Sequence, residues 1–163
     1  MARAMPRQQP AGSEQSVGTP RIFLDAVRAH LGIHEFAIDL AASHANAVCD
    51  PYFTENTDAL QQPWHPWCGG GKGWGWLNPP FSDLGPWTQK ASAEATQGAT
   101  LVMLVPAAPG SVWWLDHVYE QAYITWLRGR MAFVGHKDQY PKDLALLLFA
   151  PYLRGGDCIW KWR

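Results

Sequence analysis

The sequence lacks the marks of a secreted, membrane-spanning or zinc-binding chain. No apolar run reaches the roughly 18 residues of a membrane-spanning helix, and the initial segment MARAMPRQQPAGSEQSVG has no apolar centre of the kind that a signal peptide carries. Cysteines are few, since Cys49, Cys68 and Cys158 are far apart, odd in number and form no C-x-x-C pair. This argues against a disulfide framework and gives no indication of a metal site. We therefore expect a cytosolic protein with no membrane partner.

The chain also lacks an excess of charge of one sign. Its formal net charge is −1, so no global basic field indicates nucleic-acid binding, and any contact with DNA or RNA has to come from a local patch. Hydrophobic residues make up 47% of the 163 residues. That share excludes a disordered chain and is enough to build the core of one domain.

Tryptophan, in contrast, is abundant. The chain has ten tryptophans, and five of them crowd one segment rich in glycine and proline, at positions 64, 67, 74, 76 and 87. Such rings suit a surface that stacks on a planar ligand. Plain packing in the core is the simpler interpretation for most of them.

The order of the predicted elements indicates the fold class. Residues 1–17, rich in Gln, Pro, Gly and Ser, are typical of a flexible arm, and residues 18–163 of a single domain. Helical periodicity and turn residues predict helices over 19–32, 84–98 and 111–122. Apolar runs predict strands over 36–43, 74–80, 100–107, 123–134, 143–151 and 158–163. This alternation predicts an α/β fold with a mainly parallel sheet, and the three successive late strands predict an antiparallel hairpin at one edge.

Two predicted strands end in polar or small residues, in the segments IDLAAS (38–43) and LNPPFS (77–82). Ligands of α/β sheets bind beyond the carboxyl ends of the strands, so we expect both segments to contribute to one site.

The Asn-Pro-Pro-Phe corner presents two hydrogen-bond acceptors beside an aromatic ring. Proline has no N–H and a fixed φ, which leaves the Pro79 carbonyl to accept, and Asn78 adds a neutral amide oxygen. Two convergent acceptors suit an –NH2 group, and Phe81 can lie against a planar heterocycle. An aromatic amine is a poor nucleophile because its lone pair is delocalised into the ring. Acceptors outside the ring plane favour a pyramidal nitrogen whose lone pair is exposed to an electrophile. The alternative is that the motif merely ends a strand and begins a helix.

At this point the sequence resembles a known family. LNPPFS resembles the D/N-P-P-Y/F/W motif of S-adenosylmethionine-dependent amino methyltransferases. Together with TPRIFLDAVRAHLG, IDLAAS, NA-x-C-x-x-YFT, L-x-x-x-W, LVPA and RGRMAF it is similar to the small phage-type DNA N6-adenine methyltransferases, over roughly residues 18–150. The resemblance implies a Rossmann-like class I methyltransferase fold without a separate target-recognition domain, acting in the host cytoplasm if the chain is phage-encoded.

The resemblance also implies roles for the corner. Asn78 and the Pro79 carbonyl are expected to accept from the adenine N6 amine, Pro80 to hold the turn and Phe81 to stack on the base. Because the amine is buried in duplex DNA, the base is expected to be flipped out of the stack.

The segment expected to form the cofactor pocket departs from the pattern of many class I methyltransferases. Many class I methyltransferases have a glycine-rich loop after the first strand, whereas AIDLAASHANA has no glycine. Asp39 is expected either to contact the methionine amine of S-adenosylmethionine or to cap a turn, and Asp58 either to accept from the cofactor's adenine amine or to be a solvated loop residue. Thr19 and Pro20 either close the pocket or cap a helix. The residues assigned to the cofactor are Thr19, Pro20, Asp39, Ala41, Ala42, Ser43, Asp58 and Asn78.

Contacts with DNA phosphates are expected from a set of cations, with a solvated charged surface as the alternative. These residues are Lys72, Arg128, Arg130, Lys137 and Lys142. The absence of a separate recognition domain predicts a short target site or loose specificity. The oligomeric state is left open.

Two other classes of function fit the same residues. One is a different amino methyltransferase, acting on cytosine N4, an RNA base or a protein glutamine, because two hydrogen-bond acceptors suit the –NH2 group of each of these substrates. The other is a non-catalytic nucleic-acid-binding module, which the glycine-free segment after Asp39 keeps open.

Overall fold

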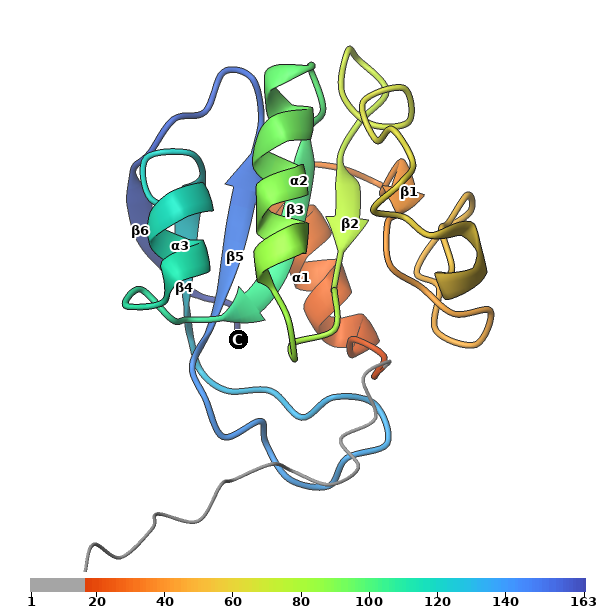
Figure 1. Ribbon diagram of the computed structural model, residues 1–163. Helices are drawn as coiled ribbons and strands as arrows, with labels where there is room; N and C mark the ends of the chain where they lie inside the picture. The colour runs from red at the N-terminus through yellow and green to blue at the C-terminus, as the bar shows by residue number, and fades with distance from the viewer. Residues whose placement is uncertain (1–16) are drawn as a thin grey trace, which may run out of the picture.

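The computed structural model describes residues 17–163, so the predicted arm over 1–17 lies outside the described residues apart from Val17. The helices are α1 (Arg21–Leu31), α2 (Gly85–Thr96), α3 (Val112–His117) and the short 3-10 helix η1 (Glu55–Thr57). The strands are β1 (Ile38–Asp39), β2 (Gly75–Leu77), β3 (Leu101–Pro106), β4 (Tyr123–Arg128), β5 (Leu144–Phe149) and β6 (Asp157–Lys161) (Figure 1). The predicted helices and strands are all present and are shorter than predicted, and β6 begins one residue earlier than predicted, at Asp157.

The strands form one six-stranded sheet in the order β1-β2-β3-β5-β4-β6. β1, β2 and β3 are parallel neighbours, β5 runs antiparallel to both β3 and β4, and β6 runs parallel to β4. The α/β class is confirmed. The antiparallel pairing of the late strands is also found, but its predicted place at the edge is wrong, because β5 is inserted inside the sheet and β6 forms the edge.

Burial explains this arrangement. All six residues of β5 are buried, as expected for a strand with a neighbour on each side and both faces covered. In β6 exposed residues alternate with partly buried ones, which suits an edge strand with a single neighbour.

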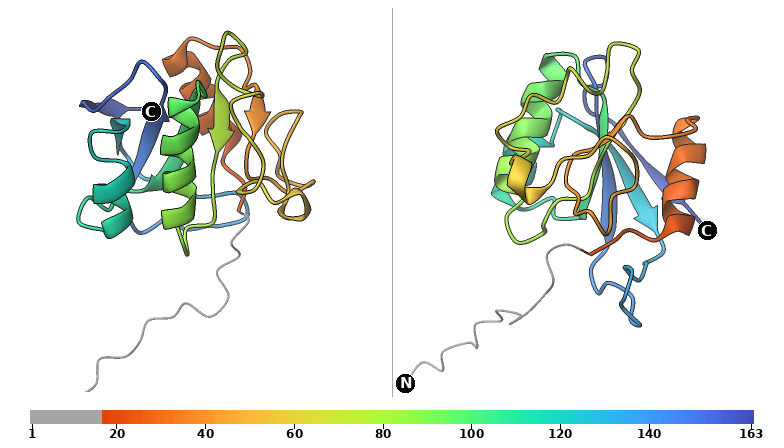
Figure 2. Two further views of the ribbon diagram at one scale, coloured as in Figure 1. Left: turned by 45° about the horizontal axis from the view of Figure 1, so that its top comes forward. Right: turned by 90° about the vertical axis from the view of Figure 1, so that its right-hand side faces the viewer.

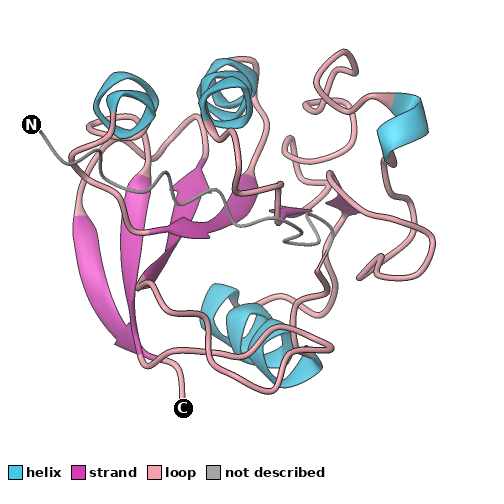
Figure 3. Ribbon diagram, turned by 60° about the horizontal axis from the view of Figure 1, so that its bottom comes forward, coloured by secondary structure: helices cyan, strands magenta, loops and turns pink. Residues whose placement is uncertain are grey.

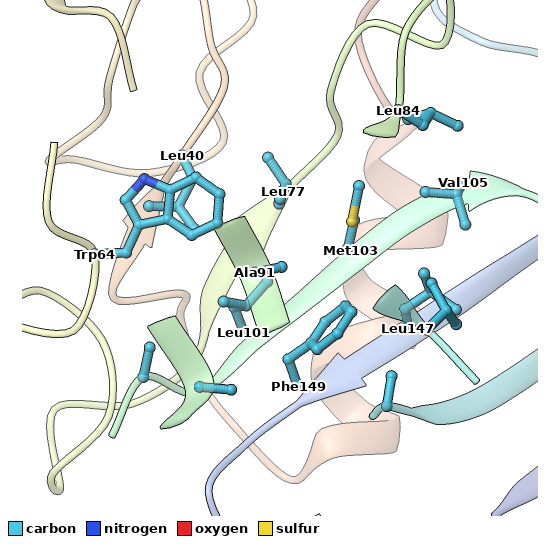
Figure 4. Packing of buried hydrophobic residues seen from close by; sticks show 14 of the residues in the cluster. Leu40, Trp64, Leu77, Leu84, Ala91, Leu101, Met103, Val105, Leu147 and Phe149 are labelled. Atoms are coloured by element: carbon cyan, nitrogen blue, oxygen red, sulfur yellow. The ribbon is translucent and has the colours of Figure 1, made fainter. Parts of the chain in front are cut away.

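Helices cover both faces of the sheet. α2 and α3 lie on one face and α1 on the other (Figures 2 and 3). Five of the six buried residues of β3 alternate between the two cores, since Leu101, Met103 and Val105 belong to one and Val102 and Leu104 to the other. Figure 4 shows the first core, where side chains of β3, β5 and α2 pack together. This two-sided burial is why the strand is a continuous apolar run rather than an alternating one.

The ends of the helices differ from the prediction in detail. Gly32 ends α1 in the left-handed conformation, with φ 68°, which favours glycine. Pro20, not Thr19, is the N-cap residue of α1, and no side chain caps this helix. α3 ends at His117 and is shorter than the predicted 111–122. Among residues 17–163, no helix is long and apolar enough to cross a membrane.

Candidate active site

A cavity of about 380 Å³ lies where β1 and β2 end. After β1 the chain passes to Tyr52, which forms a parallel bridge with Asp39 on one side of β1. It then continues to β2, which pairs with β1 on the opposite side. Such a reversal of strand order is the place where open α/β sheets bind ligands. Six of the eight residues assigned to the cofactor line this cavity, namely Thr19, Asp39, Ala41, Ala42, Asp58 and Asn78, whereas Pro20 and Ser43 do not.

Asn78 follows β2 directly and is held by the segment that precedes α1. Its Nδ2 atom donates to the Val17 carbonyl oxygen at 3.2 Å and to Thr19 Oγ1 at 3.1 Å. A backbone carbonyl only accepts hydrogen bonds, so the amide nitrogen has to face Val17, which fixes the orientation of the side chain. The Oδ1 atom points elsewhere, and no described residue donates to it. Asn78 therefore offers an amide oxygen to a ligand.

The two prolines and Phe81 differ in their relation to the cavity. Pro80 lines it, whereas Pro79 is buried and Phe81 does not line it. The Phe81 ring packs edge-on against Phe133, at a centroid distance of 6.0 Å, and against Tyr140, at 5.6 Å. Both partners come from the segment between β4 and β5. Its assigned role of stacking on a base stays a prediction.

Asp39 organises the segment that follows β1. It is 2% exposed, and its carboxylate accepts from the Ala41 N–H at 3.2 Å and from the Val48 N–H at 3.0 Å. Burial raises the pKa of Asp39 to about 6, although these two hydrogen bonds act in the opposite direction. The turn-capping interpretation of Asp39 therefore matches the geometry, and the same carboxylate lines the cavity.

The backbone explains the absence of glycine from this segment. Among the described residues, the non-glycine positions with positive φ are Asp58 and Glu120, so the chain from Leu40 to Val48 stays in conformations that alanine adopts freely. Side-chain acceptors hold the turns instead of glycines, since Asp39 binds two backbone N–H groups and Asn46 Oδ1 accepts from the Ser43 N–H at 2.6 Å.

The charge of the cavity has one sign. Asp39, Glu55 and Asp58 line it, and none of the described lining residues is Lys, Arg or His. Asp58 has a φ of 47°, a left-handed conformation that Asp adopts more readily than most residues. The cavity is therefore suited to a ligand that carries positive charge.

The aromatic segment around residue 64 supports the cavity wall. Trp87 of α2 lines the cavity and stacks on buried Trp64, with a centroid distance of 6.3 Å. Trp64 donates to the Ala59 carbonyl at 2.8 Å, and the Lys90 ammonium lies 5.4 Å from its ring centroid. Lys90 Nζ in turn binds the buried Glu94 carboxylate at 2.8 Å. Core packing, as expected, accounts for Trp64, while Trp87 faces the cavity.

The cations assigned to DNA lie at both ends of the strands, four at the carboxyl ends and Lys72 at the amino ends. Four of them are exposed at or after the end of β4, namely Arg128, Arg130, Lys137 and Lys142. β4 runs in the same direction as β3, so they lie at the carboxyl ends of the strands, where Asn78 also lies. Arg130 Nε is 3.6 Å from the Asp143 carboxylate. Lys72 precedes β2 and lies at the opposite edge, where its Nζ donates to the Pro66 carbonyl.

Sequence reasoning gave no role to several residues that line the cavity, among them Val17, Gly18, Val48 and Glu55. Glu55 had a usable signal, because it is a carboxylate three residues before Asp58 in the same turn. Trp87, one of the tryptophans that suit a stacking surface, and Asn46, the first residue of the pattern NA-x-C-x-x-YFT, also line the cavity. Among residues 17–163, no cluster of three or more His, Cys, Asp or Glu side chains is arranged to hold a metal ion.

Comparisons with known proteins agree with the resemblance seen in the sequence. The model of the family described as DNA N-6-adenine-methyltransferase (Dam) matches residues 10–148. A DNA N-6-adenine-methyltransferase of Escherichia phage T1 is 28% identical over 109 residues, which are 67% of this chain and 43% of that relative. The chain thus matches less than half of the relative's length. No solved structure matches the chain significantly. On the strength of the family match over most of its length, the chain belongs to the DNA N-6-adenine-methyltransferase (Dam) family.

Proposed function

We propose that this chain transfers a methyl group from S-adenosylmethionine to the N6 amine of adenine in DNA. The observation that carries the proposal is the orientation of Asn78: both hydrogens of its amide face Val17 and Thr19, so its oxygen is left to accept at the rim of an acidic cavity. Membership of the family and the name of the phage T1 relative support the same reaction.

The fold supports a Rossmann-like class I architecture. The reversal of strand order at β1, the parallel β1-β2-β3 set and helices on both faces are features of nucleotide-binding α/β sheets. We assign the insertion of β5 between β3 and β4 to a variant of that architecture, and residues 18–163 to one catalytic domain.

The cavity fits the methyl donor by charge and by size. S-adenosylmethionine carries a sulfonium, an ammonium and a carboxylate group, so its net charge is positive, and three carboxylates with no described cation line the cavity. Its volume of about 380 Å³ falls within the usual range for small-molecule sites. When bound, the cofactor supplies an electrophilic methyl group. We assign Asp39, Glu55 and Asp58 to holding it, with Ala41 and Ala42 allowing close approach.

The chain's own residues would act on the adenine amine. Asn78 Oδ1 and the Pro79 carbonyl would each accept one N–H of a flipped adenine, which favours a pyramidal nitrogen whose lone pair is less delocalised into the ring. These two acceptors need little reorganisation, because Asn78 is already oriented and Pro80 restricts the ψ of the buried Pro79 before it. The proton that the amine loses after transfer is left to solvent.

The experiment incubates the full chain with tritiated S-adenosylmethionine and unmethylated DNA, and then digests the DNA to nucleosides. Label is expected in N6-methyladenine. Label in N4-methylcytosine, or in RNA or protein alone, would contradict the proposal. A thermal shift with S-adenosylhomocysteine separates the remaining alternative, because a non-catalytic module without a cofactor site gains no stability from it.

A further inference from the structure

A second cavity, of about 590 Å³, lies directly beside the candidate active site. The two cavities share one wall, formed by Val17, Gly18, Thr19, Asn46 and Val48. The opposite side of the second cavity is formed by α1, through Arg21, Leu24 and Arg28. We call it the Arg21–Arg28 cleft.

The two cavities carry opposite charge. The first is lined by three carboxylates and no described Lys or Arg, whereas the cleft is lined by Arg21 and Arg28 and by no described Asp or Glu. Arg28 is partly covered, with 23% of its side chain exposed, and forms an ion pair with Asp25 on the exposed side of the helix. Arg21 is exposed and pairs with no described carboxylate. The cleft therefore offers an anion the charge of Arg21, unpaired among the described residues, and the guanidinium of Arg28, which is shared with Asp25.

The spacing of the two arginines suits an extended anion. They are seven residues apart on α1, which is two helical turns and about 10 Å along the axis. Side chains seven apart lie on the same side of a helix, and both line the cleft. Two cations at successive positions along the cleft can each contact a phosphate of an extended nucleic-acid strand, which carries one negative charge per nucleotide.

The shared wall is held on both sides. The Val134 N–H donates to the Gly18 carbonyl at 2.9 Å, and a Cβ added to Gly18 would lie 3.3 Å from the Val134 side chain. On the other side the carbonyl of Val17 and the hydroxyl of Thr19 accept from Asn78. A strand bound in the cleft is thereby placed at a fixed position relative to the Asn78 amide.

We propose that the Arg21–Arg28 cleft binds the backbone phosphates of the target DNA strand next to the flipped adenine. The proposal rests on the proposed function and adds a phosphate site on α1 to the cations after β4. Arg21 and Arg28 contact different phosphates and fix the register of the strand, so that the base reaches Asn78 across the shared wall.

The test measures binding of a fluorescently labelled DNA duplex by anisotropy at several salt concentrations. Arg21→Gln and Arg28→Gln are each expected to weaken binding to all sequences alike, and to reduce the slope of log K against log [salt] by about 1. Arg154→Gln is the matched control, because Arg154 is exposed and precedes β6, at the opposite edge of the sheet. It should leave both affinity and slope unchanged.

Three outcomes would overturn the proposal. Wild-type slopes in both variants would show that neither arginine contacts a phosphate. Equal losses in Arg154→Gln would show a general charge effect. Loss of S-adenosylmethionine affinity, with DNA binding unchanged, would assign the cleft to the carboxylate of the cofactor. Methylation of DNA by the wild-type chain is measured first, so that its absence identifies a failure of the proposed function and not of the cleft.

Discussion

Replacing Thr19 by valine tests whether the segment before α1 orients the Asn78 amide, which we propose accepts from the adenine amine. Thr19 is 8% exposed, and its hydroxyl accepts from Asn78 Nδ2 at 3.1 Å. Valine keeps the shape of the side chain but removes the acceptor. One of the two hydrogen bonds that orient Asn78 is lost, while the Val17 carbonyl still accepts at 3.2 Å.

The size of the effect follows from the energy of one neutral hydrogen bond, about 0.5–1.5 kcal/mol. If that energy serves to hold the amide in its reactive orientation, the loss raises the barrier to methyl transfer by a similar amount. Since about 1.4 kcal/mol corresponds to a factor of ten, kcat is expected to fall roughly twofold to tenfold. The rotation that would turn Oδ1 toward Val17 remains unfavourable, because it brings two acceptors together. A larger loss is therefore not expected.

The assay is single-turnover methylation of DNA at saturating S-adenosylmethionine, with cofactor affinity measured by calorimetry. Thr19→Ser is the matched control, because it keeps the hydroxyl and is expected to retain most of the wild-type rate. A wild-type rate in Thr19→Val would refute the orienting role. Equal losses in both variants would refute it as well, because Thr19→Ser keeps the hydroxyl and a loss common to both variants would not come from the missing acceptor.

Three further predictions concern the corner and the buried carboxylate. Asn78→Ala is expected to lower turnover by a factor of about 10²–10³, as for loss of one preorganised transition-state partner, while S-adenosylmethionine affinity in calorimetry stays nearly unchanged. The control is Asn56→Ala, because Asn56 lies beside the cavity but does not line it. Equal turnover in the two variants would remove Asn78 from the mechanism. Phe81→Ala is expected to weaken DNA-dependent steps by about 1–3 kcal/mol if the ring stacks on the base, measured as kcat/KM for DNA; loss of thermal stability alone would assign Phe81 to its cluster with Phe133 and Tyr140. The folded-state pKa of Asp39 is raised from 3.8 to about 6, so the protonated side chain contributes to stability below pH 4, and the free energy of unfolding falls by about 3 kcal/mol as the pH rises to 6. Urea unfolding should show this fall in the wild type and not in Asp39→Asn. The same pH dependence of the free energy of unfolding in both proteins would contradict the prediction.

The parts of the site that follow from local chemistry were predictable. Asn78 and Asp39 are polar residues directly after apolar runs, and the rule that ligands bind at the carboxyl ends of strands was enough to place them together. They are 39 positions apart in the sequence, and both line one cavity. No propensity argument was needed beyond finding the two strands.

The partners of Asn78 were not predictable in the same way. Val17 and Thr19 are 61 and 59 positions away from it, and the sequence left Thr19 two roles, closing the pocket or capping a helix, neither of which was a bond to Asn78. A hydrogen bond between segments so far apart depends on how α1 packs on the sheet, through Phe23 and Val27. That packing has no signature in the residues around the bond.

The order of the strands shows a second limit. Three apolar runs in succession suggested neighbours in sequence order, and β4 and β5 do pair. The sequence order did not reveal that β5 also pairs with β3 over six residues and so separates it from β4. Pairing between distant strands is decided by shared burial in two cores, and fully apolar runs such as Leu144–Phe149 fit several neighbours equally well.

The opposite charges of the two cavities address a difficulty that any such transfer faces. The methyl donor is cationic and DNA is a polyanion. Phosphates are therefore attracted to the donor and compete with the base for the space beside it. Carboxylates at Asp39, Glu55 and Asp58 oppose this, since two like charges 4 Å apart near a protein surface repel by about 4 kcal/mol. A neutral base meets no such repulsion, while the phosphate site proposed at Arg21 and Arg28 lies on the other side of the shared wall. Under the proposed function the wall at residues 17–19 thus sorts the target nucleotide by charge, and through Val17 and Thr19 it also holds the amide that receives the base.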